Sequence, residues 1–97
     1  MRTPWNYRVF KVRDPSDESK VYHEIYEVYY NKCGNITGRS PEPISDLFGE
    51  TLEDLQEDFA CISTAFTFPV LDRGKIDKAT KNSRSYKETK CEGEDNG

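Results

Sequence analysis

The fold is decided by residues 51–67, which read TLEDLQEDFACISTAFT. At about 100° per residue, the large apolar side chains of this segment fall on one stripe less than roughly 90° wide. These side chains are Leu52, Leu55, Phe59, Ile62 and Phe66. Thr51 stands three residues before Asp54, which is the spacing of a capping box at a helix start. Pro69 disfavours helical geometry at the preceding residue, Phe68, and so marks the helix end. The segment therefore predicts an amphipathic helix from about Thr51 to Thr67, with its apolar stripe facing a sheet.

Strands are expected on both sides of this helix, because aromatic and β-branched residues alternate with polar ones. The expected ranges are 5–12, 21–30 and about 35–40, with a short closing strand at 68–71 after the helix. Residues 14–17 break the first strand, and Gly34 fits the positive φ of a turn at 31–34. Together these elements predict an α+β domain, a three-stranded antiparallel meander packed by one amphipathic helix.

Composition divides the chain of 97 residues near residue 71. Residues 1–71 hold seven Lys or Arg against twelve Asp or Glu, whereas residues 72–97 hold seven against six. The second part has few apolar side chains, namely Ile76, Ala79, Tyr86 and Cys91. These are too few to offset a backbone entropy of about 1–2 kcal/mol per ordered residue. We therefore expect a small domain over 1–71 and a disordered charged tail over 72–97.

The strand expected at 21–30 carries large side chains on both faces. Val21, Ile25 and Tyr29 point one way, and Tyr22, Tyr26, Val28 and Tyr30 point the other way. One helix covers only one face. The second face is therefore either an open tyrosine surface or is covered by a second copy, a partner or a ligand. Its candidate partner-binding residues are Tyr22, Tyr26 and Tyr30.

The helix is also acidic, with no Lys or Arg between its start and Phe68. Carboxylates in a first turn complement the helix dipole, but Glu57 and Asp58 lie beyond that turn. This pattern predicts an acidic face for a basic protein partner, formed by Glu53, Asp54, Glu57 and Asp58. The chain's own basic segment, residues 73–90, is an intramolecular candidate for the same face.

Nothing in the sequence predicts catalytic residues, a metal site or a cofactor site. Cys33, Cys61 and Cys91 match neither a zinc pair nor a redox motif, and we interpret them as free thiols. The single histidine, His23, lies about 13 Å along a strand from Glu27. Glycine-rich phosphate loops and nucleophile elbows are absent from the sequence. We expect a protein that is not an enzyme.

The same sequence argues against membranes and weakly supports nucleic acids. It has no apolar run of about 18 residues and no apolar segment typical of a signal peptide, so we expect a cytoplasmic protein. Tyrosines on a sheet could stack on single-stranded bases, but the excess of carboxylates in residues 1–71 opposes binding to phosphates. Nucleic-acid binding is therefore kept only as an alternative.

Four segments carry a resemblance to known proteins: Trp5-Asn6-Tyr7-Arg8-Val9, Glu27-Val28-Tyr29-Tyr30, Gly49-Glu50-Thr51-Leu52-Glu53-Asp54-Leu55 and Pro69-Val70-Leu71. They resemble a group of small uncharacterised bacterial proteins, and the order of the elements is similar to HicB-like antitoxins. The resemblance implies a partial ribonuclease-H-like β-β-β-α-β domain that binds and blocks a toxin ribonuclease. This chain has residues 41–44 where the HicB pattern has Asp-x-Pro-Gly, and it lacks a C-terminal DNA-binding motif.

These observations together predict a non-catalytic protein-interaction or regulatory module. A structural homodimer is the first alternative, and a reader of single-stranded nucleic acid is the second.

Overall fold

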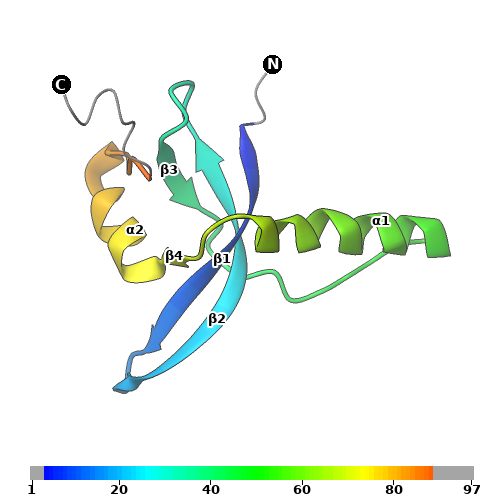
Figure 1. Ribbon diagram of the computed structural model, residues 1–97, viewed down its shortest axis with the longest axis horizontal. Helices are drawn as coiled ribbons and strands as arrows, with labels where there is room; N and C mark the ends of the chain where they lie inside the picture. The colour runs from blue at the N-terminus through cyan, green and yellow to red at the C-terminus, as the bar shows by residue number, and fades with distance from the viewer. Residues whose placement is uncertain (1–3, 89–97) are drawn as a thin grey trace.

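A computed structural model describes residues 4–88, which form one four-stranded sheet with helices on both of its faces (Figure 1). The strands are β1 (Trp5–Asp14), β2 (Asp17–Tyr30), β3 (Ile36–Arg39) and β4 (Leu71–Asp72), in the order β3-β2-β1-β4. The helices are α1 (Leu52–Ser63), α2 (Arg73–Ala79) and two 3-10 turns, η1 (Thr64–Thr67) and η2 (Lys81–Ser83). β1, β2 and β3 form the predicted antiparallel meander, and β4 joins β1 in parallel at Phe10 and Lys11. The predicted α+β class is confirmed.

The β1–β2 hairpin is longer than the sequence indicated. β1 continues to Asp14 and β2 begins at Asp17. The side chain of Asp14 accepts hydrogen bonds from Ser16 N at 2.8 Å and Ser16 Oγ at 2.7 Å, and Asp17 holds Ser19 in the same way. These bonds lower the pKa of both carboxyl groups and close a tight turn. The hairpin therefore projects as an arm beyond the body of the sheet (Figure 1).

The predicted helix start and end are confirmed, but its packing differs from the expectation. Thr51 Oγ1 accepts from Asp54 N at 3.0 Å, and the helical segment ends at Thr67. Of the apolar stripe only Ile62 is buried, whereas Leu52 and Phe59 are 66% and 59% exposed. A helix of this length spans about 18 Å, while neighbouring strands lie only about 4.8 Å apart. α1 crosses the strands, so its C-terminal end packs on β1 and its N-terminal half extends beyond the sheet (Figure 1).

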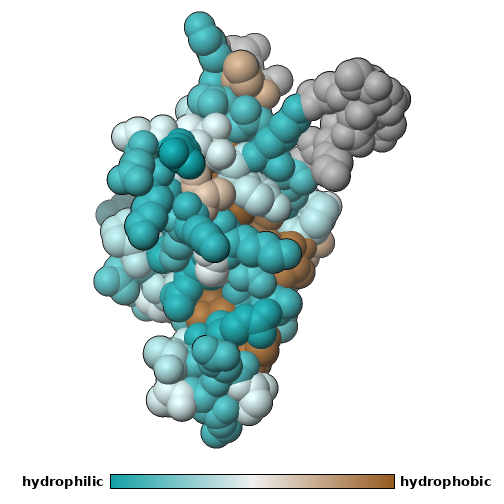
Figure 2. Space-filling model, turned by 90° about the vertical axis from the view of Figure 1, so that its left-hand side faces the viewer, coloured by the Kyte–Doolittle hydropathy of each residue, from teal (hydrophilic) through white to brown (hydrophobic). Residues whose placement is uncertain are grey.

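The second face of the sheet is covered by the chain's own α2. Ile76 of α2 is 1% exposed and belongs to the main core. The other buried members of this core are Phe10, Val12, Tyr26, Val28, Ile36 and Leu71. Hydrophilic side chains predominate on the left-hand side of the molecule, which carries α2 and the hairpin arm (Figures 1 and 2). Residues 72–88 thus differ from the expectation of a disordered tail.

Polar contacts explain why this segment is ordered despite its few apolar residues. Arg39 of β3 donates two hydrogen bonds of 2.8 Å to the carboxylate of Asp77 in α2. Ile36 and Tyr86 exchange backbone hydrogen bonds of 2.8 and 2.7 Å, which add an isolated bridge to the edge of β3. The prediction of a disordered tail considered only the number of apolar residues, so it took account of neither the ion pair nor the bridge. Residues 89–97, with Cys91, lie outside the described part of the chain.

Candidate protein-interaction surface

The segment before α1 is fixed between the sheet and the helix. At one end Ile44 N donates to Ile25 O of β2 at 2.7 Å. Further along, Phe48 N donates to Asp58 Oδ2 of α1 at 3.0 Å. Gly49 approaches the first turns of α1 so closely that a Cβ there would lie 2.2 Å from Leu55 N. This segment, residues 44–50, is therefore held as a wall beside the helix.

A Gly49→Ala substitution tests this close approach. Because the added methyl group would meet helix backbone, the wall must move, and we expect a loss of about 1–3 kcal/mol in the free energy of unfolding. Urea denaturation measures the loss. Gly38→Ala is the matched control, since a Cβ there meets only a tyrosine side-chain atom at 4.0 Å. Equal stability of the two variants would contradict the packing described.

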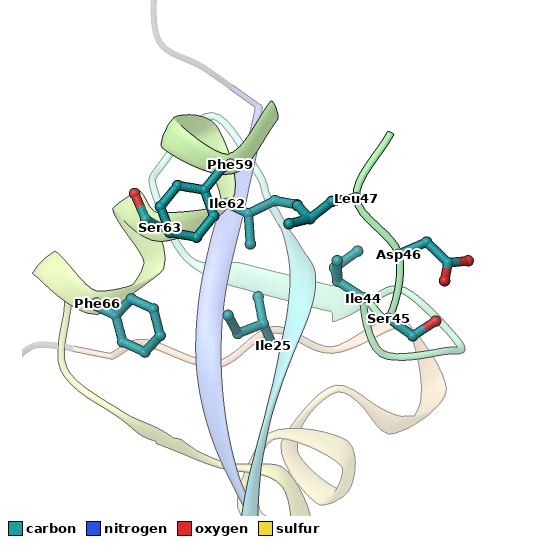
Figure 3. Close-up of a pocket in the computed structure, with 9 residues that line it drawn as sticks. All are labelled: Ile25, Ile44, Ser45, Asp46, Leu47, Phe59, Ile62, Ser63 and Phe66. Carbon is teal, nitrogen blue, oxygen red and sulfur yellow. The ribbon is translucent and has the colours of Figure 1, made fainter. Parts of the chain in front are cut away.

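An apolar pocket of about 250 Å³ lies between this wall, α1 and the sheet. Its lining comprises Ile25, Ile44, Ser45, Asp46, Leu47, Phe59, Ile62, Ser63 and Phe66. In Figure 3 Ile25 of β2 lies at the base, Phe59 and Phe66 lie on one side, and Ile44 and Leu47 lie on the other. Leu47, Phe59 and Phe66 are 48%, 59% and 70% exposed, so the rim of the pocket is itself apolar and open to solvent.

The part of the chain that forms most of this apolar surface is rich in carboxylates. Residues 40–71 contain seven Asp or Glu and no Lys or Arg. Glu53, Asp54 and Glu57 are exposed on α1. Asp58 is half-buried and has a structural role, since it accepts the hydrogen bond from the wall at Phe48. Burial raises the pKa of Tyr7 on β1, and the nearby carboxylates of Glu27 and Asp58 raise it further.

The carboxylates have a defined position relative to the stripe. At about 100° per residue, Asp54 and Asp58 lie on one flank of the apolar stripe, Glu53 lies beyond the other flank, and Glu57 lies at the back of the helix. Three of the four predicted acidic residues are therefore accessible, and α1 presents an apolar and an acidic surface together.

The candidate tyrosines are placed differently. Tyr26 is 1% exposed beneath α2. Its hydroxyl donates to Glu24 Oε1 at 2.7 Å and accepts from Arg73 Nη1 at 3.0 Å, and the Arg39 guanidinium lies 4.8 Å from its ring centre. Burial, followed by the hydrogen bond to Glu24, raises the pKa of Tyr26. A partner would reach this ring only if α2 left the sheet.

The other two tyrosines of that face contribute unequally. Tyr30 is half-buried, and its hydroxyl accepts from Arg8 Nη1 at 3.0 Å and donates to Asn6 Oδ1 at 2.7 Å. Tyr22 is 42% exposed on the projecting hairpin. The structure therefore does not gather the three rings into one exposed surface. The basic α2 packs on this face, whereas Ile25 of the pocket belongs to the opposite face, next to α1.

Other kinds of site are not evident between residues 4 and 88. Within that range no three His, Cys, Asp or Glu side chains are grouped to hold a metal ion. Cys33 and Cys61 are free and exposed. None of the helices formed by these residues is long and apolar enough to cross a membrane.

Comparison with known proteins finds no matching family model, no matching curated protein and no matching solved structure. Sequence reasoning identified the carboxylates of the candidate surface but missed the pocket. The available signal was the pair of apolar residues Ile44 and Leu47 in a largely polar stretch before the helix.

Proposed function

We propose that this protein is a non-catalytic binding module that holds a basic protein partner against α1. The observation that carries the proposal is the combination of exposed carboxylates and exposed apolar side chains on the part of α1 that extends beyond the sheet. Large apolar side chains left in water favour a covering partner. The flanking carboxylates favour a partner with Lys or Arg around its own apolar contact.

A regulatory role is consistent with this surface. The resemblance to HicB-like antitoxins supports a partner that is a basic ribonuclease, held inactive while it is bound. A small protein that binds through a protruding acidic helix needs no catalytic group of its own. In this role the sheet, with α2 on its other face, serves as the support that positions α1.

The proposal is tested with a defined probe, a fluorescent amphipathic helical peptide with Leu on one face and Lys on its flanks. A second peptide with Glu in place of Lys is the charge control. We expect the Lys peptide to bind at least tenfold more tightly at low salt, and the difference to shrink as salt screens the charges. Fluorescence anisotropy measures both affinities. Equal affinities, or no binding of the Lys peptide at 1 mM, would contradict the proposal.

The acidic residues are tested separately by charge reversal. Asp54→Lys, on the flank of the apolar stripe, is expected to weaken binding of the Lys peptide about two- to fivefold, since one exposed ion pair contributes roughly 0.2–1 kcal/mol. Glu18→Lys on the exposed hairpin arm changes the net charge by the same amount and should leave the affinity unchanged. An equal effect of both variants would show that only the overall charge matters.

A further inference from the structure

We propose that the pocket between α1, the wall of residues 44–50 and β2 receives one bulky apolar side chain from a basic amphipathic helix of the partner. This inference rests on the proposed function and adds to it the kind of partner and the point of contact. The carboxylates alone would accept any cationic surface. The pocket adds a requirement for shape, because its floor and walls are apolar.

The size of the pocket favours a side chain as its occupant. Sites for small molecules usually enclose roughly 300–1,000 Å³. This pocket has about 250 Å³, and its rim continues into the exposed stripe of α1. A single anchor in a pocket, surrounded by shallower contacts, is the usual arrangement where a helix docks in a groove. The pocket therefore fits one anchor side chain, with the rest of the docking helix lying along the stripe.

The charges favour another protein over a second copy of this chain. Two copies joined through their α1 stripes would bring together two segments, residues 40–71, that each carry seven carboxylates and no basic residue. The basic α2 of a second copy lacks an anchor, because its one large apolar side chain, Ile76, is buried in its own core. The complementary partner is therefore a helix with Lys or Arg on the flanks of an apolar face.

The pocket also lies where such a helix would meet both surfaces at once. Ile62 and Ser63 at the C-terminal end of α1 line it, while Leu55 and Leu52 continue the apolar stripe toward the N-terminus. Asp54, one turn from Asp58, lies on the flank of that stripe. An anchor in the pocket would therefore orient the docking helix along α1 and place its basic side chains near these carboxylates.

Two peptides of equal charge test the anchor in the full-length protein. Both are the Leu/Lys helix described above, one with Phe and one with Ala at a central apolar position. We expect the Phe peptide to bind at least tenfold more tightly. In NMR spectra of the complex its ring should shift the methyl resonances of Ile25 and Ile62, which face the pocket (Figure 3).

Three variants of the protein make the test specific to the pocket. Phe66→Ala removes a lining side chain of the pocket that is 70% exposed. It should reduce the preference for the Phe peptide over the Ala peptide to below threefold. Phe48→Ala removes a ring of equal size that is 72% exposed but does not line the pocket, and should leave that preference unchanged. Ser45→Trp, which places a large ring at the rim, should block the Phe peptide without affecting the Ala peptide.

The outcomes separate this inference from the proposed function. If both peptides bind equally well, or the Ile25 methyl resonance stays unshifted while the Phe peptide is bound, the anchor is overturned and the acidic binding surface stands. If the Lys peptides do not bind at all, both proposals fail. Light scattering provides the remaining outcome: a concentration-dependent dimer that shifts the same methyl resonances would place a second copy, not a basic partner, on this surface.

Discussion

A chain that ends at Leu71 is expected to lose cooperative unfolding, even though residue 71 is where the sequence composition changes. Its sheet would lack the whole of α2 and the bridge at Tyr86, so that buried side chains such as Phe10 and Tyr26 would face water. Small domains are stable by only about 5–15 kcal/mol, and this truncation removes one of the two layers that cover the sheet. Urea denaturation followed by circular dichroism should show no sigmoidal transition.

Point substitutions in α2 test the same packing through smaller losses in the free energy of unfolding. Ile76→Ala leaves a cavity in the main core and should lower the free energy of unfolding by about 2–5 kcal/mol, whereas Ile76→Val should cost about 0.5–1.5 kcal/mol. A chain ending at Glu88 keeps the contacts of α2 with the described residues and should unfold like the full chain. If residues 1–71 unfold cooperatively with unchanged stability, the packing of α2 is not what holds the sheet.

The features that were predicted correctly are those that depend on residues close together in the sequence. Thr51 with Asp54, the periodic stripe and Pro69 fixed the helix, because capping and periodicity act within a few residues. Gly34 fixed a turn in the same way, and it does adopt a positive φ of 87°. The strands of the meander followed from their alternation, with ends that shifted by a few residues.

Which segments cover the sheet depends on contacts between residues that are distant in the sequence, so this part of the fold could not be predicted from the sequence alone. Arg39 and Asp77 lie 38 residues apart, and nothing in either local sequence indicates that they pair. Ile76 stands in a largely polar segment, yet it is 1% exposed and belongs to the main core. The length of the stripe on α1, conversely, suggested full burial, whereas the narrow sheet covers only its last turn.

The same distinction applies to the candidate site. Glu53, Asp54 and Glu57 were identified because their exposure follows from the helix period. Tyr26 was expected on a face that is either open or covered by another molecule, because the chain's own covering helix was not foreseen. The pocket combines residues from β2, the wall, α1 and η1, so it exists only once these four segments meet. Its apolar character on an otherwise acidic surface is the basis of the proposal for a basic partner with an apolar anchor.

Removing the carboxylate of Glu88 is expected to destabilise the protein by about 3 kcal/mol, the lower end of the range for a broken buried ion pair. Its partner Arg8 on β1 has a side chain only 2% exposed, while that of Glu88 is 24% exposed, so water replaces the lost carboxylate poorly. Arg8 Nη1 and Nη2 donate to Glu88 at 2.8 and 2.5 Å. Nη2 also donates to Pro69 O at 2.7 Å, which ties the chain between α1 and β4 to the same group.

The contacts of Arg8 favour its charged form. Burial by itself lowers its pKa, but the hydrogen bonds with Glu88 and Tyr30 outweigh burial and leave the pKa raised. Glu88→Ala therefore leaves a buried cation without its carboxylate. When Arg8→Met is added to that variant, the cation is removed as well. The double variant should thus lose at least 1 kcal/mol less free energy of unfolding than the two single variants lose together.

Urea unfolding of the four chains in this cycle measures the coupling directly. Glu18→Ala on the hairpin arm is the control for loss of an exposed carboxylate, and should change the free energy of unfolding by less than about 0.5 kcal/mol. Strictly additive losses for Arg8 and Glu88 would contradict a buried pair. A positive coupling would show that the last described residue of the chain stabilises its first strand, through two charges that are 80 positions apart in sequence and joined by two hydrogen bonds.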